Sequence, residues 1–142
     1  MTKLNDTNQI QCPSAQPSAD AVVIGVVTGA GQERRIGYLT EPQAATERVL
    51  ELAAPAVPTE VFRLASPCMG EGCKHFAGGA CTLVQRVVAS LDPVVSALPP
   101  CRIRPVCRWF RQEGPDACVR CPQVITTTYD ATELQRQVAD SD

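Results

Sequence analysis

Seven of the eight cysteines lie between residues 68 and 121, in two segments that follow the same plan. In the first segment, CMGEGCKHFAGGAC, a cysteine and a short loop precede Cys-Lys-His-Phe, which a glycine-containing loop and another cysteine follow. The second segment, CRIRPVCRWFRQEGPDACVRC, has the same order around Cys-Arg-Trp-Phe. Residues 68–81 and 101–121 are therefore interpreted as a degenerate internal repeat.

The cellular location decides how these thiols are interpreted. The opening MTKLNDTNQIQCPSAQPSAD lacks the apolar stretch of a secretory signal. No run approaches the roughly 18–20 apolar residues that a membrane helix needs. We therefore expect a cytoplasmic protein with no membrane partner, in which dense cysteines indicate metal or redox chemistry rather than disulfides.

The candidate metal ligands are seven thiols and one imidazole. They are Cys68, Cys73, Cys81, Cys101, Cys107, Cys118, Cys121 and His75. Because closed metal sites take four ligands, the sequence allows two arrangements. The first arrangement has two sites, one formed by Cys68, Cys73, Cys81 and His75 and the other by Cys101, Cys107, Cys118 and Cys121. In the second arrangement, the two repeats share one cluster that uses four of the seven thiols. Cys12 lies outside the repeats and is predicted to be a bystander.

The spacing of the thiols favours an iron–sulfur cluster, of the 4Fe-4S type, over zinc. Zinc ribbons present paired Cys-x2-Cys knuckles, whereas only Cys118 and Cys121 have that spacing. A cluster is larger than one ion and accepts ligands from more distant loops. Cys121-Pro122 also matches the end of bacterial ferredoxin motifs. Trp109 and Phe110 are expected to pack over the site and exclude water.

The tandem Cys-x4/5-Cys-[Lys/Arg]-[His/Trp]-Phe pattern with its following cysteine resembles small cysteine-rich bacterial proteins. The resemblance covers about residues 20–125 and implies iron–sulfur binding without supplying catalytic residues.

The remaining sequence predicts an α+β fold. Residues 22–27 are a continuous β-branched strand, residues 35–39 a returning strand, and residues 60–64 a third strand. Thr40 and Gln43 resemble a capping box for a helix that ends near residue 54. This small β-β-α-β unit precedes a cysteine-rich, mostly helical and loop region that binds metal.

The domain organisation follows from these elements. Residues 1–20 are predicted to be a flexible tail, residues 21–125 one α+β domain, and residues 126–142 a short helix and tail. Only 4% of residues are aromatic, so bound metal is expected to help organise the core.

The expected function is electron transfer, or service as an accessory to a redox enzyme with a protein redox partner. The only histidine lies within the cysteine group, so no Ser/His/Asp set is available and independent catalysis is not expected. The net charge of -2 argues against a chain-wide attraction to nucleic acid, although arginines surround the second segment and leave local binding open. The alternatives are a structural zinc module that binds protein or nucleic acid, and a thiol redox sensor at Cys118 and Cys121.

Overall fold

The computed structural model describes residues 9–29, 33–126 and 138. A four-stranded antiparallel sheet in the order β1-β4-β2-β3 lies at its centre. The strands are β1 (Gln11–Cys12), β2 (Val22–Thr28), β3 (Arg35–Ala44) and β4 (Phe62–Pro67). With short helices on both sides of this sheet, the α+β class is confirmed.

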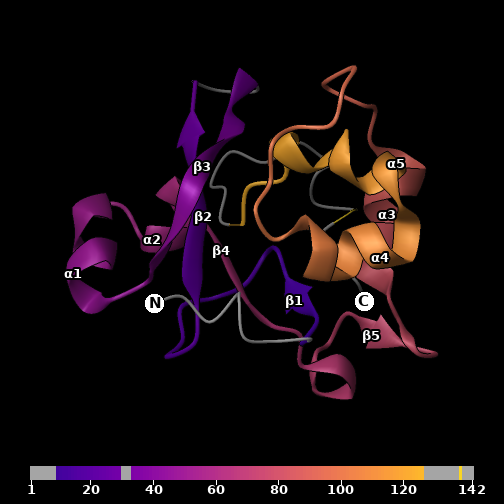
Figure 1. Cartoon of the computed structure of the whole chain (residues 1–142), viewed down its shortest axis with the longest axis horizontal. Helices are drawn as coiled ribbons and strands as arrows, with labels where there is room; N and C mark the ends of the chain where they lie inside the picture. The colour runs from indigo at the N-terminus through magenta and orange to yellow at the C-terminus, as the bar shows by residue number, and fades with distance from the viewer. Residues whose placement is uncertain (1–8, 30–32, 127–137, 139–142) are drawn as a thin grey trace.

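The two central strands bury side chains on both faces of the sheet. Successive residues of a strand point to opposite faces. Val22 and Ile24 of β2 accordingly lie in one core, whereas Val23 lies in another with Phe62 and Leu64 of β4. A strand covered on both faces needs apolar residues at consecutive positions, which explains the successive β-branched residues Val22, Val23 and Ile24. Figure 1 shows the resulting layers, with α1 and α2 on one side of the sheet and α3, α4 and α5 on the other.

The layer of α1 and α2 begins later than the sequence predicted. It contains α1 (Glu47–Leu50), the 3-10 turn η3 (Glu51–Ala53) and α2 (Pro58–Val61). The Thr46 hydroxyl caps α1 by accepting a hydrogen bond of 3.2 Å from the Val49 N–H. The predicted capping box at Thr40 is wrong, because residues 40–44 continue β3, in which Gln43 and Ala44 pair with β2.

The opposite layer carries the cysteine-rich segments. Its elements are η4 (Gly70–Gly72), β5 (Phe76–Ala77), β6 (Ala80–Cys81), α3 (Thr82–Ser90), η5 (Arg104–Val106), α4 (Arg108–Glu113), α5 (Pro115–Cys118) and η6 (Cys121–Gln123). Between these helices and the sheet lies the thiol-side core, whose largest buried side chain is Trp109. None of the helices in the described residues has the length and apolar character required to cross a membrane.

The predicted N-terminal tail differs from the structure in its second half. Gln11 and Cys12 form an edge strand on β4, and Pro13 and Ala15 are buried. The Ala15 N–H also donates to the Leu64 carbonyl at 3.1 Å. Residues 11–15 are therefore part of the folded core.

The short helix predicted within residues 126–142 falls outside the described residues except at residue 138. Val138 is buried in the thiol-side core, and its carbonyl accepts a hydrogen bond of 2.6 Å from Arg86 Nε.

Candidate metal centres

The eight cysteines are free thiols, which we divide into two sets of four according to their place in the fold. We call Cys12, Cys68, Cys73 and Cys81 the N-terminal thiol group. We call Cys101, Cys107, Cys118 and Cys121 the C-terminal thiol group.

Strand pairing assembles the N-terminal thiol group. Cys12 pairs with Ser66 at the end of β4, and the Cys68 N–H donates to the Ile10 carbonyl at 2.8 Å. Cys81 is delivered by the β5–β6 hairpin, in which it pairs with Phe76. The two turn residues of this hairpin, Gly78 and Gly79, have φ values of 62° and 79°. Positive φ at both positions is the geometry of a type I′ turn, which explains the Gly-Gly pair.

The thiols of this group influence one another electrostatically. Burial raises the pKa of Cys12 to about 11, and the neighbouring Cys68 and Cys81 add to the rise. Burial likewise raises the pKa of Cys81, and Cys73 and Cys68 contribute to it. The antiparallel pairing of β1 with β4 places Cys12 close to Cys68, in agreement with these effects.

The C-terminal thiol group surrounds a cavity of about 20 Å³. Its four cysteines all line the cavity, and the remaining walls include Tyr38, Arg104, Trp109 and Phe110. Burial raises the pKa of Cys107 to about 12, with a further contribution from Cys121 and Cys101. Burial also raises the pKa of Cys101 and of Cys118. Uncharged thiols are thus favoured here unless a cation compensates the charge of the thiolates.

Sulfur atoms in both groups accept hydrogen bonds from N–H groups. Cys68 Sγ accepts from the Gly70 N–H at 3.5 Å, Cys73 Sγ from the His75 N–H at 3.4 Å, and Cys121 Sγ from Arg63 Nη2 at 2.9 Å. Such donors favour thiolate, the form of cysteine that binds metal.

Arg63 is a completely buried arginine that contacts the C-terminal thiol group. Its Nε donates to the Pro13 carbonyl, Nη1 to the carbonyls of Cys121 (3.1 Å) and Val124 (2.9 Å), and Nη2 to Cys121 Sγ (2.9 Å). Its guanidinium carbon lies 5.3 Å from the centre of the Trp109 ring. Burial alone would lower the pKa of Arg63, but Cys121 and Tyr38 outweigh that effect and raise it. The side chain therefore stays charged.

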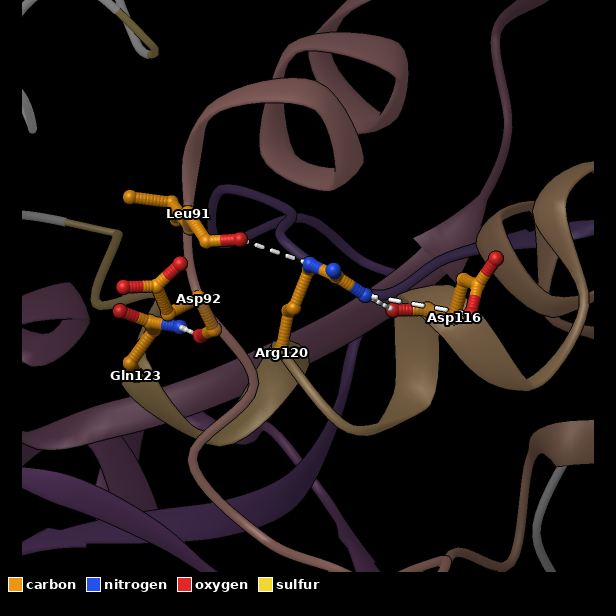
Figure 2. Close-up of polar contacts among 5 residues, drawn as sticks. All are labelled: Leu91, Asp92, Asp116, Arg120 and Gln123. Atoms are coloured by element: carbon orange, nitrogen blue, oxygen red, sulfur yellow. Dashed lines mark hydrogen bonds and ion pairs between the residues drawn. The ribbon is translucent and has the colours of Figure 1, made fainter.

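The segment that carries Cys118 and Cys121 is fastened to the loop after α3. Figure 2 shows Arg120 Nε donating to the Leu91 carbonyl at 2.7 Å, while Nη1 donates to the Asp116 carbonyl at 2.8 Å. Beside it, Gln123 Nε2 donates to the Asp92 carbonyl at 2.6 Å. These bonds hold the two thiols in place through the backbone between them.

Gln112 of α4 connects the second repeat to the first. Its Oε1 accepts from the Cys81 N–H and its Nε2 donates to the Cys81 carbonyl, both at 2.9 Å. The Arg108 guanidinium also lies 5.2 Å from the centre of the Phe76 ring. The two repeats therefore pack against each other while their thiols form separate groups.

His75 is engaged with Arg86 rather than with the thiols. Its Nδ1 lies 3.1 Å from Arg86 Nη2, and because a guanidinium only donates, Nδ1 is the acceptor. Partial burial, Arg86 and Lys74 lower the pKa of His75. Near Cys68 the pairing of β1 with β4 instead places Cys12.

The sequence reasoning did not single out Arg63, which contacts the C-terminal thiol group, and it set Cys12 apart from the other thiols. The only signal for Arg63 was one charged residue inside an otherwise apolar strand. The only signal for Cys12 was the total number of cysteines, because eight cysteines divide into two sets of four.

Buried donors at the C-terminal thiol group suit an anionic, sulfur-rich cofactor. Within the described residues, Trp109 Nε1 and Arg104 Nε are buried and have no hydrogen-bond partner. Both residues line the cavity. A cavity of about 20 Å³ holds about one water molecule, so a cluster requires the surrounding loops to move apart. Within the described ranges, no group of three or more His, Cys, Asp or Glu side chains is arranged to hold a metal ion.

No protein-family model, curated protein or solved structure matches the chain. The functional interpretation therefore rests on the residues and geometry described above.

Proposed function

We propose that this is an iron–sulfur protein of the cytoplasm that carries electrons between protein partners or serves as an accessory to a redox enzyme. The observation that carries the proposal is the C-terminal thiol group: four cysteines line one cavity, and the buried Arg63 donates a hydrogen bond to Cys121 Sγ at 2.9 Å. Four thiolates are the usual ligand set of a 4Fe-4S cluster.

The side chains around this group have defined roles in the proposal. Cys101, Cys107, Cys118 and Cys121 would hold the cluster. The guanidinium of Arg63, with its hydrogen bond to Cys121 Sγ, offsets negative charge and raises the reduction potential. Trp109, which is only 1% exposed, keeps water from this side of the site. The bound cluster supplies one-electron chemistry, taking an electron from a reduced protein and passing it to an oxidised one.

The proposed partner surface is the positively charged segment beside these thiols. Arg102 and Arg111 are exposed, in a chain whose overall charge is negative. A local positive patch attracts an acidic protein surface and aligns it before contact.

Metal analysis of anaerobically purified protein tests the proposal. We expect a brown protein with broad visible absorption that contains iron and acid-labile sulfide in equal amounts. Cys107→Ser should lose the iron and sulfide that the C-terminal thiol group binds, whereas Arg102→Met, which changes an exposed neighbour of Cys101, should retain the full content. A colourless protein with stoichiometric zinc would overturn the proposal in favour of a zinc module, since four thiolates also suit zinc. A metal-free, stably folded protein that cycles between dithiol and disulfide would favour a redox sensor.

A further inference from the structure

We propose that the N-terminal thiol group is a second cluster site, in which Cys12 is the fourth ligand and His75 is not a ligand. The metal's identity depends on the function proposed above, but the existence and composition of this second site do not.

The position of Cys12 is fixed by the sheet. Its strand pairs antiparallel with the end of β4, where Cys12 lies opposite Ser66, and the chain continues to Cys68 two residues later. The bond from the Cys68 N–H to the Ile10 carbonyl extends this pairing to the first cysteine of the repeat. A residue of the N-terminal segment is thereby held beside thiols that are distant in the sequence.

The segment after Cys12 is also held rigidly. Pro13 is buried, and its carbonyl accepts a hydrogen bond from the buried Arg63. Arg63 in turn binds Cys121 of the other group, so one guanidinium connects the backbone beside Cys12 to the C-terminal thiol group. The local placement of Cys12 therefore does not depend on a loosely attached chain end.

The internal repeat gives the same division of ligands. Each repeat contributes three thiols at corresponding positions, Cys68, Cys73 and Cys81 in the first and Cys101, Cys107 and Cys118 in the second. The fourth thiol comes from outside the corresponding positions: Cys121 follows the second set, and Cys12 joins the first through β1. His75 is excluded because its Nδ1 accepts from Arg86, which also binds Thr82 and Val138.

The test is a count of metal in the full chain after anaerobic reconstitution with iron and sulfide. Iron and sulfide per chain should fall twofold in Cys12→Ser and twofold in Cys107→Ser, and the double variant should bind neither. His75→Gln, which keeps a side chain of similar size, should retain the full content. Unchanged iron in Cys12→Ser, or a twofold loss in His75→Gln without one in Cys12→Ser, would overturn the second site.

A second measurement on the unmodified sequence covers the case in which Cys12→Ser fails to fold. Cys12 in the loaded protein should resist iodoacetamide and become reactive together with Cys68, Cys73 and Cys81 when a chelator removes the metal. Equal reactivity of Cys12 with and without metal would overturn the assignment. If the metal is zinc, the proposed function fails, yet a twofold loss of zinc in Cys12→Ser would still establish the second site.

Discussion

Arg63 joins segments that lie far apart in the chain, and we expect its replacement to destabilise the fold. Its buried guanidinium donates to the carbonyls of Pro13, Cys121 and Val124 and to Cys121 Sγ. Arg63→Met should lower the free energy of unfolding by about 3–5 kcal/mol, because buried acceptors lose a charged donor. Urea denaturation of the anaerobically purified protein measures this change.

The matched control for Arg63→Met is Arg102→Met. Arg102 is exposed and donates to the Thr40 carbonyl at 3.1 Å, so its loss should cost no more than about 0.5 kcal/mol. Arg63→Lys keeps the charge but loses the planar fork of donors and should give an intermediate loss. Equal effects of the two methionine variants would show that the buried guanidinium does not hold these segments together.

Residues whose role depends on distant partners could not be predicted from the sequence. The seven cysteines of the repeats were recognisable because their spacing and neighbours recur locally. Cys12 was interpreted as a bystander because its proximity to Cys68 arises from the β1–β4 pairing, which leaves no local pattern in a two-residue strand. Its ligand role remains a proposal.

At the scale of elements, the backbone around α5 depends on Arg120. We expect Arg120→Met to lower the free energy of unfolding by about 1–3 kcal/mol, because the Leu91 and Asp116 carbonyls lose their donor (Figure 2). Iron should also be lost faster to a chelator, since this segment carries Cys118 and Cys121. Denaturation and chelator kinetics give the two readouts.

The variant Asp116→Asn removes the ion pair of Arg120 but leaves its hydrogen bonds to the backbone carbonyls in place. The Asp116 side chain is 74% exposed and 4.0 Å from Arg120 Nη1, a geometry that contributes little stability. This variant should behave like the unmodified protein in both measurements. A loss as large as that in Arg120→Met would assign the effect to the ion pair instead.

The contact between β2 and β3 depends on a glycine at the irregularity of β2. A Cβ at residue 25 would lie 2.5 Å from Ile36 Cγ2 and 3.0 Å from the Gly37 carbonyl oxygen. We expect Gly25→Ala to lower the free energy of unfolding by about 1–3 kcal/mol, since the strands must separate locally. Thermal and urea unfolding would detect it.

Gly37→Ala is the control on the neighbouring strand. Its Cβ would meet Val26 O at 3.7 Å and Thr28 Cγ2 at 3.8 Å, which are ordinary contacts. This variant should retain its stability. A comparable loss in both alanine variants would indicate a general cost of alanine in this strand pair rather than a specific close approach.

The elements that the sequence predicted well are those with a strong local pattern. The β-branched run of residues 22–27 predicted β2, whose observed range is Val22–Thr28. The box at Thr40 and Gln43 was misleading because hydrogen bonding across to β2 outweighs a local capping preference, and helix α1 begins only after Thr46. A capping signal identified from sequence alone does not include the free energy of pairing with a neighbouring strand.

At the scale of the whole molecule, the two faces of the sheet depend on different stabilising groups. The core beside α1 and α2 is formed by aliphatic and aromatic side chains, including Val23, Phe62 and Leu64. The thiol-side core also contains aliphatic and aromatic side chains such as Val84 and Trp109, and it adds the buried Cys81 and Cys107. The helices α3, α4 and α5 cover it. The longest of these helices has nine residues, too few for stability in isolation. Bound metal would therefore stabilise one side of the sheet selectively.

Metal removal should consequently loosen the molecule unevenly. After anaerobic chelation we expect backbone amides of α3, α4 and α5 to exchange with deuterium much faster, because buried thiols lose the cation that offsets their charge and the short helices lose their anchor. Amides of β2 and its partners β3 and β4 should remain protected by the opposite core. Hydrogen exchange followed by mass spectrometry resolves these segments. Equal acceleration in the sheet and the helices would mean that metal supports the whole fold as one cooperative unit, and unchanged exchange would mean that it supports neither side.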